Sequence, residues 1–405
     1  MPALIHFRER IALYALLTSL TSVSIDALLP GLRAIGADLG ISPPLSTQHI
    51  ISLFILGMAF GELLLGPLSD ALGRKKVLIL GLCVYAAGTV VAMLAGSLEM
   101  VVFGRFLQGV GVAGPKIATR AMIRDQFEGD AMARVMSFMF TLFILVPMLA
   151  PALAQVIITA AGWRSVFLFY LAMAGLLGFW LTLRQPETLP PERRIAFRPR
   201  LLFRNGQRIL TNRRVVLLIL ATGLVFGAHL LYLSTAADLF FDAYGVTESF
   251  PLYFAVLATG IGLASFLNAR LVQRFGMDAM ARAGFLCLTV SGGAMLLVVL
   301  AFGSHLPLTV LLAMTYAAFF AIGILFGNLN AMAMRSLGQV AGLAASLIAS
   351  GSSLVATVFA VALGHFYDGT ALVLACGFLI AGVLSLILSA FAARGSAGPV
   401  EAVSC

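Results

Sequence analysis

The sequence predicts an all-α membrane protein with twelve transmembrane helices in two pseudo-symmetric six-helix bundles. Hydrophobic residues make up 61% of the 405-residue chain and charged residues 11%, about half the charged share of a typical soluble domain. Apolar stretches of about 20 residues recur along the chain, and each could cross ~30 Å of hydrocarbon as a helix. A transmembrane barrel is excluded because segments such as Val215–Phe226 do not alternate in hydropathy.

Twelve candidate spans lie between charged, proline or glycine breaks. They begin near residues 11, 47, 76, 99, 132, 162, 214, 249, 279, 306, 340 and 369. The first, Ile11–Pro30, lacks a small-residue cleavage site, so we interpret it as a retained helix and not a signal peptide. The four cysteines are far apart and offer no metal-binding or disulfide spacing, and we expect no metal and no cofactor.

Positive charge gathers in alternate loops, which are numbered here by the helices they join. Loop 2–3 holds Arg74, Lys75 and Lys76, loop 4–5 holds Arg120, Arg124 and Arg134, and loop 6–7 holds nine arginines from Arg184 to Arg214. The opposite loops carry the acids Glu99, Asp242, Glu248 and Asp368. By the positive-inside rule both termini are cytoplasmic, which requires an even number of spans. We interpret the basic run as an anchor on anionic headgroups, not as a nucleic-acid site.

The chain divides into two halves. We predict an N-terminal bundle at residues 1–184, an Arg-rich cytoplasmic linker at 185–213, a C-terminal bundle at 214–394 and a disordered tail at 395–405. The halves are weak repeats, because an offset of 203 residues maps Gly73 onto Gly276 and Asp26 onto His229. Repeated halves are typical of transporters whose binding site lies near the bilayer midplane.

Six motifs, taken together, carry a family resemblance. They are Asp26-Ala-Leu-Leu-Pro30, Gly66-Pro-Leu-Ser-Asp-Ala-Leu-Gly-Arg-Lys75, Arg105-Phe-Leu-Gln-Gly-Val-Gly111, Met122-Ile-Arg-Asp125, Pro147-Met-Leu-Ala-Pro151 and Pro186-Glu-Thr-Leu-Pro-Pro-Glu-Arg-Arg194. Over nearly the whole chain they resemble the major facilitator superfamily, and within it the drug:proton antiporters of the bicyclomycin-resistance type. The chain departs from that pattern at Ala71, at Glu62 and at Lys116, where the family commonly has arginine, glutamine and an uncharged residue.

The resemblance implies the major facilitator fold and a function. It implies a monomeric secondary active transporter of a bacterial inner membrane, with partners limited to a small-molecule substrate, protons and the lipid bilayer. Its activity would be proton-coupled efflux of small apolar compounds of the multidrug, bicyclomycin or chloramphenicol type, by alternating access. The alternative is a proton-coupled importer of a metabolite or siderophore with the same fold. An enzyme is disfavoured because the chain lacks the HExxH and GxSxG motifs, and it lacks an ATP-binding loop.

Ionisable residues inside the spans are candidates for proton coupling, because each costs ~2.5–3.5 kcal/mol at a helix centre. Asp26 lies four residues before Pro30 and Arg105 six residues after Glu99, so both lie about 6–9 Å inside and are expected to reach one another. We expect Asp26 to exchange a proton that Arg105 tunes; a static ion pair is the alternative. Glu62 could bind protons or a cationic drug, or could pair with Lys116.

Loop 2–3 is a candidate gate. Gly73 permits a tight turn and Gly66 a close helix approach. Asp70 could accept hydrogen bonds from the N-terminus of a nearby helix, and Arg74 could pair with Asp125. Breaking these contacts would open one side of the protein, whereas a purely topological role for the cations is the alternative.

Two further sets of residues complete the candidate site. Pro147 and Pro151 remove backbone donors and bend helix 5, and the resemblance implies that they influence exchange direction. An adaptable apolar pocket could be lined by Phe140, Met148, Phe226 and Phe254, with His229 beside them. Ordinary packing is the alternative for each of these side chains.

Overall fold

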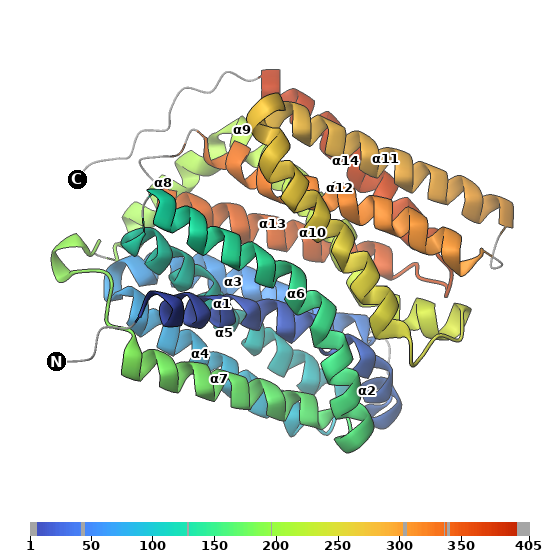
Figure 1. Ribbon diagram of the computed structural model, residues 1–405, viewed down its shortest axis with the longest axis horizontal. Helices are drawn as coiled ribbons and strands as arrows, with labels where there is room; N and C mark the ends of the chain where they lie inside the picture. The colour runs from blue at the N-terminus through green and yellow to red at the C-terminus, as the bar shows by residue number, and fades with distance from the viewer. Residues whose placement is uncertain are drawn as a thin grey trace. The chain divides into compact units, whose positions relative to one another are not determined.

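The computed structural model describes residues 6–41, 45–127, 129–195, 197–302, 306–335, 337 and 341–394, with the side chains at 129–134, 136–144, 199, 201 and 341 excepted. Regular structure in these ranges is helical throughout (Figure 1). The chain forms two compact units, Met1–Leu202 and Phe203–Cys405.

Each unit contains six helices of 20 residues or more among the described residues. The N-terminal unit has α1 (Phe7–Asp26), α3 (Gln48–Leu72), α4 (Arg74–Met93), α5 (Leu98–Gln126), α6 (Gly129–Ala161) and α7 (Arg164–Arg184). The C-terminal unit has α9 (Arg213–Asp238), α10 (Phe250–Phe275), α11 (Met277–Phe302), α12 (Leu308–Met334), α13 (Ala341–Gly364) and α14 (Leu372–Arg394). These helices begin within four residues of the predicted starts, and the predicted fold class is confirmed.

Ten helical segments of the described residues are long and apolar enough to cross a membrane by length and composition. The long helices α5 and α6 fall outside that set. Helix α5 carries Arg105, Lys116, Arg120 and Arg124 along its length, and α6 contributes the shorter apolar stretch Leu145–Ala161. Thus α5 concentrates charge within an otherwise apolar bundle.

The first span differs from its predicted extent. The sequence predicts a helix through Pro30, but α1 ends at Asp26, and the short helices η1 (Leu29–Gly31) and α2 (Leu32–Leu39) follow. The physical reason is Pro30, which lacks a backbone N–H and cannot continue the helical hydrogen bonding. The early end of α1 leaves carbonyl groups near Asp26 without helical donors.

Glycines let α5 approach its neighbours in the N-terminal unit. Gly57 of α3 faces the Phe106 carbonyl of α5, and Gly109 of α5 faces the Phe54 carbonyl of α3, with no room for a Cβ at either position. Small residues at helix crossings allow this backbone contact in membrane bundles. Helix α5 packs against α4 as well, so it lies at the centre of its unit.

The polar stretch between the bundles contains structure that the sequence analysis treats as a loop. It holds a short helix η2 (Pro191–Arg193) and a helix α8 (Pro199–Thr211). Three arginines of α8, Arg200, Arg204 and Arg208, follow one another at four-residue spacing, which places them on one helix face. The predicted tail at 395–405 lies outside the described residues.

Candidate functional site

Arg105 joins three helices of the N-terminal unit. Its side chain is completely buried. The guanidinium donates to the Ser24 carbonyl of α1 at 2.8 Å, to Gln108 Oε1 of α5 at 2.8 Å and to the Ile50 carbonyl of α3 at 3.3 Å. It also lies 4.2 Å from the ring centroid of Phe54. A buried charge is tolerated only when its hydrogen bonds are made in this way.

Further buried polar groups extend this contact. Gln108 donates to Thr89 Oγ1 of α4 at 2.7 Å, and the Ser24 and Tyr85 hydroxyls lie 2.7 Å apart. The Tyr170 hydroxyl of α7 donates to the Ser24 carbonyl at 3.3 Å. None of these partners is among the predicted site residues, although the spacing of Gln108, one helical turn after Arg105, indicates that the two side chains can meet.

Asp26 does not pair with Arg105 as expected from the sequence. Its residue is buried, with 6% exposure, and within the described residues its carboxylate forms no hydrogen bond or ion pair with that guanidinium. The cause is the end of α1 at Asp26. The Ser24 carbonyl has no helical donor there, and the negative end of the helix attracts the guanidinium in place of the carboxylate.

Glu62 and Lys116 form the ion pair that the sequence analysis considered. Glu62 Oε1 lies 2.5 Å from Lys116 Nζ, and the Glu62 side chain is completely buried. Arg120 follows one turn later on α5, and its residue is exposed. The sequence pattern places Arg120 in loop 4–5, because the charged end of α5 does not resemble a membrane helix.

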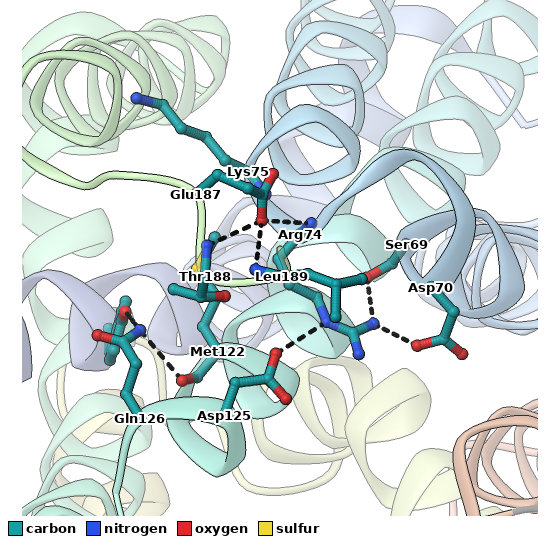
Figure 2. Close-up of polar contacts among 11 residues, drawn as sticks. Ser69, Asp70, Arg74, Lys75, Met122, Asp125, Gln126, Glu187, Thr188 and Leu189 are labelled. Carbon is teal, nitrogen blue, oxygen red and sulfur yellow. Dashed lines mark hydrogen bonds and ion pairs between the residues drawn. The ribbon is translucent and has the colours of Figure 1, made fainter. Parts of the chain in front are cut away.

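The turn between α3 and α4 carries a cluster around Arg74, whose residue is 5% exposed. Its guanidinium donates to Ser69 Oγ at 2.9 Å, to Asp70 Oδ1 at 2.5 Å and to Asp125 Oδ2 at 3.1 Å. Figure 2 shows the guanidinium between the two carboxylates. The predicted pairing of Arg74 with Asp125 is therefore present, and Arg74 also binds Asp70.

Glu187 is a partner that the sequence analysis missed. Its carboxylate accepts hydrogen bonds from the backbone N–H groups of Arg74 at 2.9 Å and Lys75 at 3.2 Å, the first residues of α4 (Figure 2). These donors have no partner within the helix, and the positive helix end favours an anion. Gly73, with a φ of 107°, has no room for a Cβ beside this carboxylate. The 186–194 motif contains two acids, Glu187 and Glu192, and the structure places the first of them at the start of α4.

The predicted residues of α6 are described unequally. Pro147 and Pro151 both lie inside the helix, and Met148 is half-buried. The side chain of Phe140 lies outside the described residues. Gly66 is buried within α3.

Three of the predicted pocket residues meet in one aromatic cluster of the C-terminal unit. Phe226 and His229 of α9 lie 6.1 and 6.2 Å from Phe326 of α12, measured between ring centroids. His229 lies 5.0 Å from Phe319. The ring centroid of Tyr232 lies 4.8 Å from that of Phe319 and 6.2 Å from that of Phe254 of α10, which is one of the predicted pocket residues. The sequence pattern does not predict Phe319, Phe326 and Tyr232 as members of this cluster, because helical spacing alone does not tell which aromatic residues face one another.

Two buried polar atoms in this aromatic cluster lack hydrogen-bond partners among the described residues. They are His229 Nδ1 and the Tyr232 hydroxyl. Tyr232 is 1% exposed. An unpaired buried polar atom is costly, so these two atoms are suited to receive a hydrogen-bonding group of a ligand among aromatic rings.

Sequence comparisons give consistent relatives. Residues 14–360 match the Major Facilitator Superfamily. The chain is 31% identical over 340 residues to a bicyclomycin resistance protein homolog of Haemophilus influenzae, which covers 83% of each chain. It is 30% identical over 250 residues to the multidrug resistance protein MdtL of Salmonella typhimurium, covering 61% of this chain and 62% of that one.

Solved structures with low sequence identity share the fold. The D-xylose-proton symporter matches with a TM-score of 0.74 at 16% identity, over 96% of this chain and 98% of that one. The human organic anion transporter MFSD10 matches with a TM-score of 0.67 at 19% identity, over 95% and 98%. At these identities the likeness concerns the fold alone.

Proposed function

The chain belongs to the major facilitator superfamily and is a multi-pass membrane transporter and not an enzyme, and from this premise we propose that it exports small, mainly apolar drug-like compounds from bacteria in exchange for protons. Relatives at about 30% identity are named for bicyclomycin and multidrug resistance, which supports the choice of substrates. The protein would lie in the inner membrane as a monomer, with both termini in the cytoplasm.

The observation that carries the proposal is the environment of Asp26. A buried carboxyl group within a membrane helix is expensive and marks a functional position. Arg105 is occupied by carbonyls and Gln108, so it fixes the end of α1 without neutralising Asp26. Asp26 thus takes up a proton when one side of the membrane has access to it and releases it to the other side.

The remaining groups supply binding and gating. The aromatic cluster of the C-terminal unit offers apolar contact area and two unpaired polar atoms for a substrate. Glu62 and Lys116 form a second ionisable pair that assists coupling. The Arg74 cluster stabilises the closed arrangement of one end of the N-terminal unit. Its contacts break when that end opens, as alternating access requires.

The experiment is proton-driven uptake of chloramphenicol into inside-out vesicles, together with drug susceptibility in an efflux-deficient host. Asp26→Asn should abolish both proton-driven uptake and resistance, because Asn cannot exchange a proton. Asp38→Asn is the control, since Asp38 is half-exposed and paired with Arg164. Proton-coupled uptake that survives in Asp26→Asn would contradict the assignment.

The same vesicles separate the alternative function. An importer of a metabolite or siderophore would accumulate substrate in right-side-out vesicles and leave drug resistance unchanged.

A further inference from the structure

Helix α5 presents three basic side chains at one-turn spacing. Lys116, Arg120 and Arg124 are each four residues apart, so they follow one face of the helix. Thr119 and Met122, which lie off this face, are buried. Along the basic face itself, Lys116 is partly covered by α3, whereas Arg120 and Arg124 are exposed.

Charge is not balanced at the inner part of this face. Glu62 of α3 is completely buried and pairs with Lys116 at 2.5 Å. Arg120 interacts electrostatically with Glu62, but its side chain forms no hydrogen bond or ion pair within the described residues. The two cations Lys116 and Arg120 therefore share the single carboxylate of Glu62. Among the described side chains, no second anion pairs with Arg120.

The exposed fraction of the side chain increases from Glu62 to Lys116 to Arg120. The Glu62 side chain is 0% exposed and that of Lys116 18% exposed, whereas Arg120 is exposed. An anion therefore reaches Arg120 first. It then competes with Glu62 for the ammonium group of Lys116, whose other hydrogen bond among the described residues goes to the weak acceptor Met58 Sδ at 3.4 Å.

We propose that Lys116 and Arg120 bind the acidic group of a transported compound, so that the substrates of this protein include apolar and aromatic acids. The inference rests on the proposed export function and narrows its substrate class. Glu62 holds Lys116 while no substrate is bound and is displaced when the substrate's carboxylate arrives. A carboxylate fits both the fork of a guanidinium and an ammonium group.

The test measures binding, so it does not depend on proton coupling. Isothermal titration calorimetry of the purified full-length protein compares chloramphenicol succinate, which carries one carboxylate, with its methyl ester, which has nearly the same skeleton and no charge. The wild type should bind the succinate about tenfold or more tightly than the ester, as expected for one charge-assisted contact. Arg120→Gln should remove this preference, and Arg124→Gln should leave it unchanged.

Two further variants should change the affinity for the succinate in opposite directions. Glu62→Gln should tighten binding of the succinate, because the competing carboxylate is gone. Adding Lys116→Gln to Glu62→Gln should weaken it again, without leaving a buried carboxylate unpaired. Phosphatidylglycerol offers an anionic phosphate, and loss of the succinate preference on its addition would assign the cluster to lipid headgroups and overturn the proposal.

The outcomes separate this inference from the function on which it rests. Equal affinity for succinate and ester, or an Arg120→Gln variant that keeps the preference, would overturn the inference alone. Failure to bind chloramphenicol, its succinate and the ester would contradict the proposed drug export as well.

Discussion

Arg105 is a completely buried cation of the N-terminal unit, so its hydrogen bonds must be made within the protein. It has no room to reach water, and its N–H groups donate to acceptors on α1, α3 and α5. A guanidinium offers five N–H donors in a planar fork, whereas lysine offers a compact charge with three. The three-helix contact therefore depends on the shape of the side chain as well as on its charge.

Arg105→Lys should lower the stability of the purified protein by about 2–4 kcal/mol, because buried hydrogen bonds to a charged group are lost, and should abolish drug resistance. Thermal unfolding in detergent measures the first effect and susceptibility assays the second. The control is Arg335→Lys, whose exposed ion pair with Asp278 should contribute little. Equal effects of the two substitutions would contradict the structural role of Arg105.

The geometry at Asp26 explains why the predicted contact between Asp26 and Arg105 is wrong. Burial of both charges follows from their positions in apolar runs. Their expected contact depended on a helix continuing to Pro30, whereas α1 ends at Asp26 and offers its own carbonyls. One or two residues at a helix end decide this, and sequence patterns define helix ends least well.

Gly73 is a second residue at which the backbone sets the requirement. Its φ of 107° and ψ of 152° lie in a region essentially restricted to glycine. Gly73→Ala should destabilise the protein by about 1–3 kcal/mol and disturb the Glu187 contact, as measured by thermal unfolding. Gly96→Ala is the matched control, because open space surrounds Gly96; a similar loss in both variants would contradict this reasoning.

At the scale of elements, the linker and α4 are joined by one carboxylate. Glu187 accepts from the first two N–H groups of α4 and from its own neighbours Thr188 and Leu189. A second contact is the hydrogen bond from the Ile195 N–H to the Asp70 carbonyl at 3.0 Å. The segment after α7 therefore covers the turn between α3 and α4, where the Arg74 cluster lies.

Glu187→Ala should loosen this attachment, with a cost of about 1–2 kcal/mol that is typical of losing a helix N-cap. Hydrogen exchange of the backbone amides at the start of α4 should become faster, while exchange in the middle of α4 should stay slow. Glu192→Ala, an exposed acid of the same segment, is the control. Unchanged exchange at Arg74 and Lys75 would refute the cap.

The elements also show where sequence patterns lose information. Apolar runs predict the long helices because a bilayer demands about 20 apolar residues per span. They do not identify α8, whose composition is polar and whose pattern is amphipathic. They also end α5 too early, so that Arg120 is taken for a loop residue although it continues the face of Lys116.

At the scale of the whole molecule, the two units repeat one plan. Gly73 and Gly276 end α3 and α10 with φ values of 107° and 79°, as the 203-residue offset predicts. Close packing also recurs, since Gly61 of α3 faces Val110 of α5, and Gly323 of α12 faces Ile261 of α10. The fold is predictable because membrane burial and duplication restrict it strongly, whereas the polar contacts of the site depend on individual side-chain directions.

The charge distribution of the chain leads to the last prediction, its orientation in the membrane. Arginines gather between α7 and α9. At the other ends of the helices, Asp242 lies in the short helix Leu239–Ala243 that follows α9, and Glu248 and Asp368 lie in the connections before α10 and α14. A hydrogen bond from the Thr370 hydroxyl holds the pKa of Asp368 below its ordinary value, so this turn keeps its negative charge at neutral pH. Positive charge is retained on the cytoplasmic side, and these acids should therefore lie outside the cytoplasm.

Cysteine labelling tests this orientation in a variant whose native cysteines are replaced by serine. A membrane-impermeant maleimide should label Glu248→Cys in cells with a permeabilised outer membrane, and Arg204→Cys only in inside-out vesicles. Both positions are exposed, so a failure to react reflects the membrane and not burial. The reverse labelling pattern would show that the protein has the opposite orientation in the membrane. The Arg74 cluster would then face the outside and could not act as the cytoplasmic gate of an exporter.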